Sequence, residues 1–179
     1  MSRASQTSGA SFESLIERHH DRALDLGIVP CKIEHNQAYS KVVGGKLIYT
    51  KPGISDYSGI VLGWFGPKTC APLGAEAKST KKDRLPRSAV EPLQAKYLDA
   101  VARAGGLALL LVEFRAQDIR TAIPWLEVPW QVLKSAESLS VADVRKEWQF
   151  SAEGCYLERC CPPERRSPPA KARRIFPRE

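Results

Sequence analysis

The chain has 179 residues, 43% hydrophobic and 26% charged, a composition that predicts one globular domain and excludes a fully disordered or collagen-like chain. The longest apolar stretch, Gly105 to Val112, is too short to span a bilayer, so no membrane partner is expected. The N-terminus has no apolar segment of the kind a secretory signal carries, so we expect a cytoplasmic, nucleoid-associated protein. Lys and Arg number 27 against 20 Asp and Glu, and the net charge of +7 favours a polyanionic partner.

The first half of the chain predicts a helix followed by strands. Residues 1–10 are small and polar and are expected to be a disordered leader, with the folded domain over residues 11–150. Apolar residues at helical spacing predict a helix from Ser11 to near Gly27, and a short strand over residues 28–33 follows. Gly44-Gly45 then predicts a hairpin turn or a flexible loop.

The second half predicts a mixed α/β arrangement. Strands are expected over residues 58–65 and 73–80 as a hairpin, and a helix over 88–103 follows. The continuous apolar run 107–114 is typical of a strand buried on both faces, and a capped third helix is expected over 140–147. This order predicts a small α/β domain with a mixed central sheet.

The C-terminal region is rich in Cys, Pro and Arg, and residues 151–179 are expected to form a largely disordered basic tail. Its cysteines have no second Cys pair and no nearby histidine that would complete a zinc site. An odd number of cysteines without a signal peptide favours free thiols; the five are Cys31, Cys70, Cys155, Cys160 and Cys161.

The residues best suited to chemistry lie between Asp56 and Lys78. Asp56 precedes a predicted strand, and Glu76 and Lys78 lie two residues apart on the next, so their side chains leave one face of the sheet. Two carboxylates on adjacent strands can hold Mg²⁺, and Mn²⁺ suits the same oxygen ligands. A lysine beside them can orient a water and offset phosphate charge. The same Glu-x-Lys spacing also occurs in ordinary surface ion pairs, so the residues alone leave both interpretations open.

Five segments between Ser11 and about Trp130 occur in an informative order: SFESLIERHHD, KPGISDYSGIVLG, GAEAKST, EPLQAKYLDAVARAGG and LALLLVEF. Together they resemble the PD-(D/E)XK nuclease superfamily and, within it, the RecU-type Holliday junction resolvases. The resemblance implies a restriction-endonuclease-like core, a mixed central sheet flanked by helices. It also implies that Asp56 and Glu76 are metal ligands and that Lys78 positions the water.

The resemblance also implies two helical site residues. Glu13, early in the first helix, would complete the acidic site. Glu17, one turn later, is the alternative carboxylate, for which a solvated helix face is the preferred interpretation. Gln94 in the second long helix would orient either a phosphate or the lysine.

Basic residues flank the implied site on both sides in the sequence. A phosphate backbone requires such flanks, although ordinary solubilising charge is the alternative. The expected DNA-binding residues are Lys41, Lys46, Lys51, Lys81, Lys82, Arg84 and Arg87.

The function implied by the resemblance is a Mg²⁺-dependent endodeoxyribonuclease that resolves four-way junctions by paired phosphodiester hydrolysis in recombination and repair. A two-fold symmetric junction suits a homodimer. Family members insert a stalk before the catalytic aspartate, whereas only 19 residues separate Asn36 from Asp56 here, enough for a short hairpin. Two alternatives therefore stand: a nuclease of this fold with a nicking, restriction-like or repair substrate, and a non-catalytic DNA-binding protein.

Overall fold

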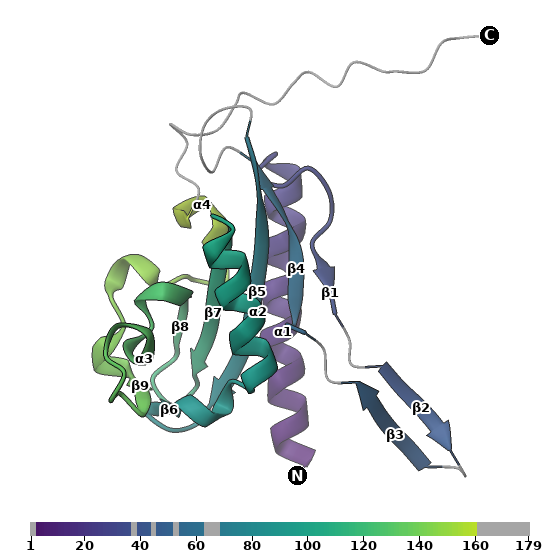
Figure 1. The fold of residues 1–179 in the computed structure, drawn as a ribbon, viewed down its shortest axis with the longest axis vertical. Coiled ribbons are helices and arrows are strands. Elements are labelled where there is room, and N and C mark those ends of the chain that lie inside the picture. The colour runs from purple at the N-terminus through teal and green to yellow at the C-terminus, as the bar shows by residue number, and fades with distance from the viewer. Residues whose placement is uncertain (1–2, 37–38, 44–45, 52–53, 63–68, 161–179) are drawn as a thin grey trace, which may run out of the picture.

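The computed structural model describes residues 3–36, 39–43, 46–51, 54–62 and 69–160, and the side chains of residues 11–36, 54–62 and 69–160 among them. A five-stranded sheet in the order β1-β4-β5-β7-β8 forms its centre (Figure 1). Only the β5–β7 pair is parallel, so the sheet is mixed as the sequence predicts. The five strands are β1 (Glu34–His35), β4 (Tyr57–Leu62), β5 (Cys70–Thr80), β7 (Leu107–Phe114) and β8 (Ile119–Pro124).

Two small antiparallel pairs lie outside this sheet. The strands β2 (Tyr39–Val43) and β3 (Lys46–Lys51) form a hairpin between β1 and β4, at the predicted place, although Gly44-Gly45 themselves lie outside the described residues. The strands β6 (Arg84–Pro86) and β9 (Ser138–Ser140) form the second pair, which the sequence did not predict. In Figure 1 both pairs lie toward the end of the central sheet where β5 finishes.

Helices cover both faces of the sheet. The helix α1 (Arg3–Asp25) packs on one face, against Leu107, Leu109 and Leu111 of β7. The helix α2 (Pro92–Arg103) packs on the other, against Ala108 and Leu110. Successive side chains of a strand point to opposite faces, and all eight residues of β7 are buried. The prediction of a strand buried on both faces is therefore confirmed, and the protein is a three-layer α/β structure. None of the described helices is long and apolar enough to cross a membrane.

Close contact between α2 and β5 depends on Gly74. A Cβ atom at this position would lie 2.8 Å from the Tyr97 ring and 3.1 Å from a methyl group of Val101. The glycine thus lets α2 approach the sheet face from which Glu76 and Lys78 also project, because residues 74, 76 and 78 share one side of the strand.

The N-terminal predictions need two corrections. The helix α1 begins at Arg3 rather than Ser11, so residues 3–10 are helical and not a disordered leader. Residues 28–33 form no strand, although Ile28, Val29 and Ile33 are buried. The amides of Ile28 and Val29 donate to the carbonyl of Ala23 near the end of α1, so these donors are not available to a neighbouring strand. Gly27 follows α1 with a positive φ of 66°, as expected of a helix-ending glycine.

The C-terminal predictions were also wrong in two places. The expected helix over 140–147 is replaced by two 3-10 turns, η3 (Val141–Asp143) and η4 (Lys146–Trp148). Its predicted cap is confirmed, since Ser140 N donates to Asp143 Oδ2 over 2.7 Å. Residues 151–160 are not irregular tail: they include the short helix α4 (Tyr156–Cys160). A further four-residue helix, α3, spans Pro129–Val132. Residues 161–179, with Cys161 and the basic tail, lie outside the described residues.

The helix α4 packs against α1 through buried hydrogen bonds. Tyr156 N donates to His19 Nδ1 over 3.2 Å, and the Tyr156 hydroxyl lies 2.5 Å from His20 Nε2. Tyr156 and Leu157 are almost completely buried and join the cluster of core residues beneath α1. Cys31, Cys70 and Cys155 have free thiols, as predicted, whereas Cys161 lies outside the described residues.

Candidate active site

Two carboxylates face each other where β4 begins. The β4–β5 register pairs Tyr57 with Ala75, which places Asp56 opposite Glu76. Asp56 N donates to Glu76 Oε2 over 3.2 Å, and Ala77 N donates to Asp56 Oδ2 over 2.9 Å. Each strand therefore fixes the carboxylate of the other through a backbone amide. The prediction that Asp56 and Glu76 lie together is confirmed.

Lys78 completes the predicted group of three residues. Its Nζ donates to Glu76 Oε1 over 2.6 Å, a charge-assisted hydrogen bond. The Glu76 side chain is fully buried, whereas 23% of the Lys78 side chain is exposed. The buried Glu76 carboxylate distinguishes this pair from an ordinary surface ion pair, which was the alternative interpretation of the Glu-x-Lys spacing. The Lys78 ammonium group can be reached from solvent.

The electrostatics of Glu76 make the site a suitable place for a cation. Burial, and then the neighbouring Asp56 carboxylate, raise the pKa of Glu76 to about 7, while Lys78 opposes the rise. A divalent cation between the two carboxylates would remove this repulsion, and Mg²⁺ favours such oxygen ligands. No group of three or more His, Cys, Asp or Glu side chains arranged to hold a metal occurs among the described residues. Asp56 and Glu76 are the two carboxylates that β4 and β5 bring together, and a cation bound between them would need water or phosphate as further ligands.

Tyr57 lies among the acidic residues, and the sequence analysis gave it no role. Its ring is completely buried, and its hydroxyl has no hydrogen-bond partner among the described residues. Burial raises the pKa of Tyr57 far above its ordinary value, and nearby carboxylates raise it further. In order of decreasing effect these carboxylates belong to Glu13, Asp56, Glu17 and Glu76.

The helix carboxylates occupy different surroundings. Glu13 is exposed on α1, close enough to Tyr57 to act on it electrostatically. Glu17 accepts a hydrogen bond from His35 Nδ1 over 3.0 Å, and the His35 ring stacks on Tyr57 with 4.8 Å between ring centroids. Glu17 is therefore engaged with β1 rather than simply solvated. The sequence did not predict this contact between Glu17 and His35, because it forms only when β1 pairs with β4.

Gln94 lies in the first turn of α2 and is 8% exposed. Its Oε1 accepts a hydrogen bond from Glu91 N over 2.9 Å, and the Glu91 side chain accepts from the backbone N–H of Gln94. The two residues thus form a capping box at the start of the helix. The sequence did not predict this capping role of Gln94.

The predicted DNA-binding residues fall into two groups. Lys81, Lys82, Arg84 and Arg87 are exposed on the turn after β5 and on the residues that follow. The other group, Lys41, Lys46 and Lys51, lies on the β2–β3 hairpin, and their side chains are outside the described ones. Both groups lie toward the end of the sheet where β5 finishes (Figure 1).

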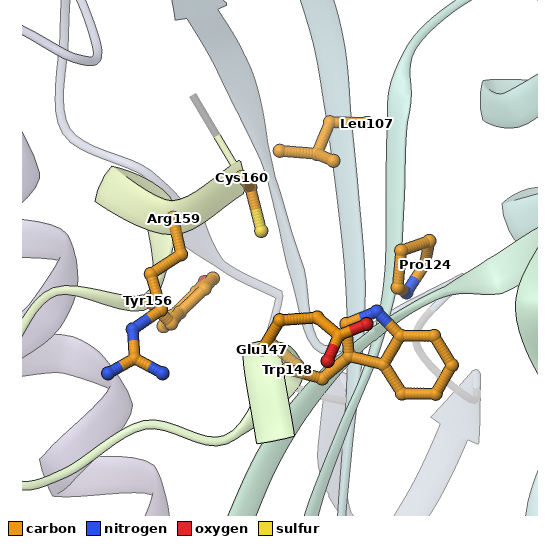
Figure 2. A pocket seen from close by; sticks show the side chains of 8 residues that line it. Leu107, Pro124, Glu147, Trp148, Tyr156, Arg159 and Cys160 are labelled. Atoms are coloured by element: carbon orange, nitrogen blue, oxygen red, sulfur yellow. The ribbon is translucent and has the colours of Figure 1, made fainter. Parts of the chain in front are cut away.

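A separate cavity of about 230 Å³ lies between α4 and the β7–β8 edge (Figure 2). Its lining is mostly apolar and includes Leu107, Pro124, Trp148 and Tyr156, with Glu147 and Arg159 also present. None of the predicted site residues lines it. The group formed by Asp56, Glu76 and Lys78 therefore remains the candidate site.

A comparison with protein families matches the part of the chain that contains this candidate site. The family model of recombination protein U matches residues 9–153, which is most of the chain and contains every predicted catalytic residue. The chain belongs to the RecU family. The match confirms the resemblance to RecU-type Holliday junction resolvases drawn from the sequence. No individual curated protein matches the chain.

Proposed function

We propose that this RecU-family protein is a metal-dependent DNA endonuclease with a PD-(D/E)XK core, and that it resolves four-way junctions by paired phosphodiester hydrolysis. The observation that carries the proposal is the contact of Asp56, Glu76 and Lys78 at the start of β4, in a chain that matches the RecU family over residues 9–153. These residue types supply what phosphodiester hydrolysis needs: oxygen ligands for a cation and a positive group for the phosphate.

The proposal gives each of these residues a role that its surroundings support. Asp56 and Glu76 would hold Mg²⁺ or Mn²⁺, which acts as a Lewis acid on the phosphate and lowers the pKa of a bound water. Lys78 is held by Glu76 with its ammonium group partly exposed, so it can orient a water or stabilise charge on the phosphate oxygens. Glu13 on α1 acts electrostatically on Tyr57, the residue after Asp56, and would add negative charge on that side of the sheet.

The proposed substrate suits a homodimer. A four-way junction has two-fold symmetry, and paired cuts need two sites related by the same symmetry. The β2–β3 hairpin lies in the chain just before Asp56, between β1 and β4. We propose that this hairpin and the basic residues after β5 contact the DNA arms on either side of the cleaved phosphate.

The experiment that tests the proposal is cleavage of a labelled four-way junction in Mg²⁺ and in EDTA. Linear duplex, flap and single-stranded DNA are the substrate controls, and Glu76→Gln is the site variant. Glu113→Gln is its matched control, since Glu113 is also a buried strand carboxylate but is held by Arg120 and Ser79. It lies on the opposite face of the sheet from Glu76, because Glu113 pairs with Ser79 and Glu76 with Leu110.

We expect symmetric, metal-dependent cuts near the crossover that are lost in Glu76→Gln and kept in Glu113→Gln. Equal cutting of all the DNA substrates would keep the nuclease and refute the junction preference. Tight binding without any cutting would favour a non-catalytic DNA-binding protein. Light scattering on the same preparation tests the homodimer, and a purely monomeric wild type that still makes paired cuts would refute that part.

A further inference from the structure

We propose that Tyr57 is a positioning residue: its buried hydroxyl donates a hydrogen bond to the Glu13 carboxylate and holds this carboxylate toward a cation bound between β4 and β5. The inference rests on the proposed nuclease function, because it concerns the same cation site. It goes beyond that function by giving a task to Tyr57, for which neither the sequence nor the family match suggests one.

The Tyr57 hydroxyl is a donor without an acceptor. The Tyr57 ring stacks on His35 with 4.8 Å between ring centroids, and it meets the His20 ring edge-on at 4.9 Å. The side chain is completely buried, and its hydroxyl forms no hydrogen bond within the part of the chain that the structure describes. Burial raises the pKa of Tyr57 far above its ordinary value, so the hydroxyl keeps its proton at neutral pH. A phenylalanine would fill the same space without leaving a buried polar group unpaired.

Two contacts determine how α1 runs along β4. Leu62 N, at the end of β4, donates to the Ile28 carbonyl just after α1 over 2.8 Å. His20, earlier in the helix, contacts Tyr57 at the start of β4. The helix residues before His20 therefore extend past the start of β4, on the side where Asp56 precedes the strand.

Glu13 is the carboxylate that this direction of α1 brings toward the Tyr57 hydroxyl. Glu13, Glu17 and His20 are spaced so that they lie on one stripe of the helix. Glu17 accepts from His35, and Glu13 lies one turn beyond it, about 6 Å further past the start of β4. Of the carboxylates that act electrostatically on Tyr57, Glu13 has the largest effect. Its side chain is exposed, so its carboxylate is free to turn toward the hydroxyl.

A third carboxylate held at this place would strengthen cation binding. Mg²⁺ in proteins usually keeps several waters beside one or two carboxylate ligands. Glu13 would accept hydrogen bonds from such waters with one oxygen while the other oxygen accepts from Tyr57. Removal of a group that orients a ligand in this way typically weakens metal binding about tenfold to a hundredfold.

The first test measures the binding of Mn²⁺ alone by isothermal titration calorimetry, with urea unfolding in EDTA on the same proteins. Tyr57→Phe removes only the hydroxyl and should weaken Mn²⁺ binding about tenfold. Its urea midpoint in EDTA should equal or exceed that of the wild type, because an unpaired buried hydroxyl is removed. Unchanged Mn²⁺ affinity would overturn the inference. A lower urea midpoint would also overturn it, since the hydroxyl would then already have a partner.

Tyr156→Phe is the matched control. Tyr156 belongs to the same buried cluster as Tyr57, but its hydroxyl is paired with His20 Nε2. Loss of this hydrogen bond should lower the urea midpoint and leave the Mn²⁺ affinity unchanged. If Tyr57→Phe showed the same pattern as Tyr156→Phe, the role of Tyr57 would be structural and the inference would fail.

The second test identifies the acceptor with double variants. Glu13 and Glu17 are both exposed and alanine favours a helix, so Glu13→Ala and Glu17→Ala should preserve α1. Adding Tyr57→Phe to Glu13→Ala should change the Mn²⁺ affinity by less than about twofold, because the two residues act as one unit. Adding it to Glu17→Ala should still weaken binding about tenfold. The reverse pattern would make Glu17 the acceptor and would overturn the assignment of Glu13.

Single-turnover cleavage of the four-way junction distinguishes this inference from the proposed function. Tyr57→Phe should cut about tenfold more slowly than the wild type at subsaturating Mn²⁺ and should approach the wild-type rate as Mn²⁺ is raised. Equal cleavage and equal Mn²⁺ affinity for the two proteins would overturn the inference and leave the nuclease proposal standing. A wild type that neither binds Mn²⁺ nor cuts DNA would overturn both.

Discussion

Replacing Glu76 with glutamine should stabilise the fold at the same time as it abolishes cleavage. Glu76 is completely buried beside Asp56, and its pKa is raised to about 7 from an ordinary value of 4.5. The folded protein therefore holds this proton more tightly than the unfolded chain does. Relative to higher pH, the stability that protonated Glu76 gives the folded state is fully present below pH 4.5, and it is lost as the pH rises toward 7. Above pH 7 the ionised carboxylate destabilises the folded state, and glutamine avoids this cost.

The size of the effect follows from the shift. A difference of 2.5 pKa units corresponds to about 3 kcal/mol once Glu76 is fully ionised in both states. Between pH 5 and pH 8 the wild type should lose roughly 2–3 kcal/mol of its free energy of unfolding through Glu76. The difference between wild type and Glu76→Gln therefore reports on Glu76 together with its contacts to Asp56 and Lys78.

The assay is urea unfolding of both proteins in EDTA from pH 5 to pH 8. The stability advantage of Glu76→Gln over the wild type should grow with pH and level off above about pH 7. Millimolar Mg²⁺ should raise the stability of the wild type and not that of the variant, since a bound cation stabilises only the folded state. Parallel pH curves for the two proteins would refute the electrostatic account of the site.

Three further predictions concern the core and the DNA surface. Burial lowers the pKa of His20 to about 3, so the folded state loses stability as the pH falls below 6.5, by roughly 2 kcal/mol at pH 5. His20→Gln should therefore lose less stability in acid when unfolding is measured against pH, and an unchanged pH profile would contradict this. Gly106→Ala would bring a Cβ to 2.5 Å from the Pro72 carbonyl oxygen and should cost about 1–3 kcal/mol of stability, which equal urea midpoints would refute. Replacing both Lys81 and Lys82 with alanine should reduce the slope of log binding constant against log salt by about 1.8, whereas an unchanged slope would show that neither contacts phosphate.

The sequence predicted the strands β4, β5 and β7 and the contact between Asp56 and Glu76, because their signals are local, but it did not predict β1 and β8. The apolar run of β7 marks a strand covered on both faces, and the spacing of Glu76 and Lys78 determines that both leave one face. The approach of Asp56 to Glu76 needed only the expected β4–β5 hairpin. None of these features depends on a distant part of the chain.

The errors arose where tertiary contacts override local patterns. Residues 28–33 carry strand-forming side chains, yet two of their amides bond to the end of α1. The helix α4 follows a change to Cys, Pro and Arg, and it is ordered because Tyr156 contacts His19 and His20, more than a hundred residues away. Similarly, Gln94 Oε1 accepts from the backbone amide of Glu91 and caps the start of α2, and residue identity alone does not reveal such a contact.

The attachment of α4 to α1 has a consequence for the order in which the protein can fold during synthesis. The core cluster beneath α1 contains residues from Phe12 to Leu157, so the apolar residues of α1 meet their last partners only after Leu157 has left the ribosome. Until then the apolar face of α1 lacks part of its cover, and such faces favour association with other chains or with chaperones. Nascent chains stopped before Leu157 should therefore remain sensitive to protease, and release of the complete domain should be the step that makes the first helix resistant.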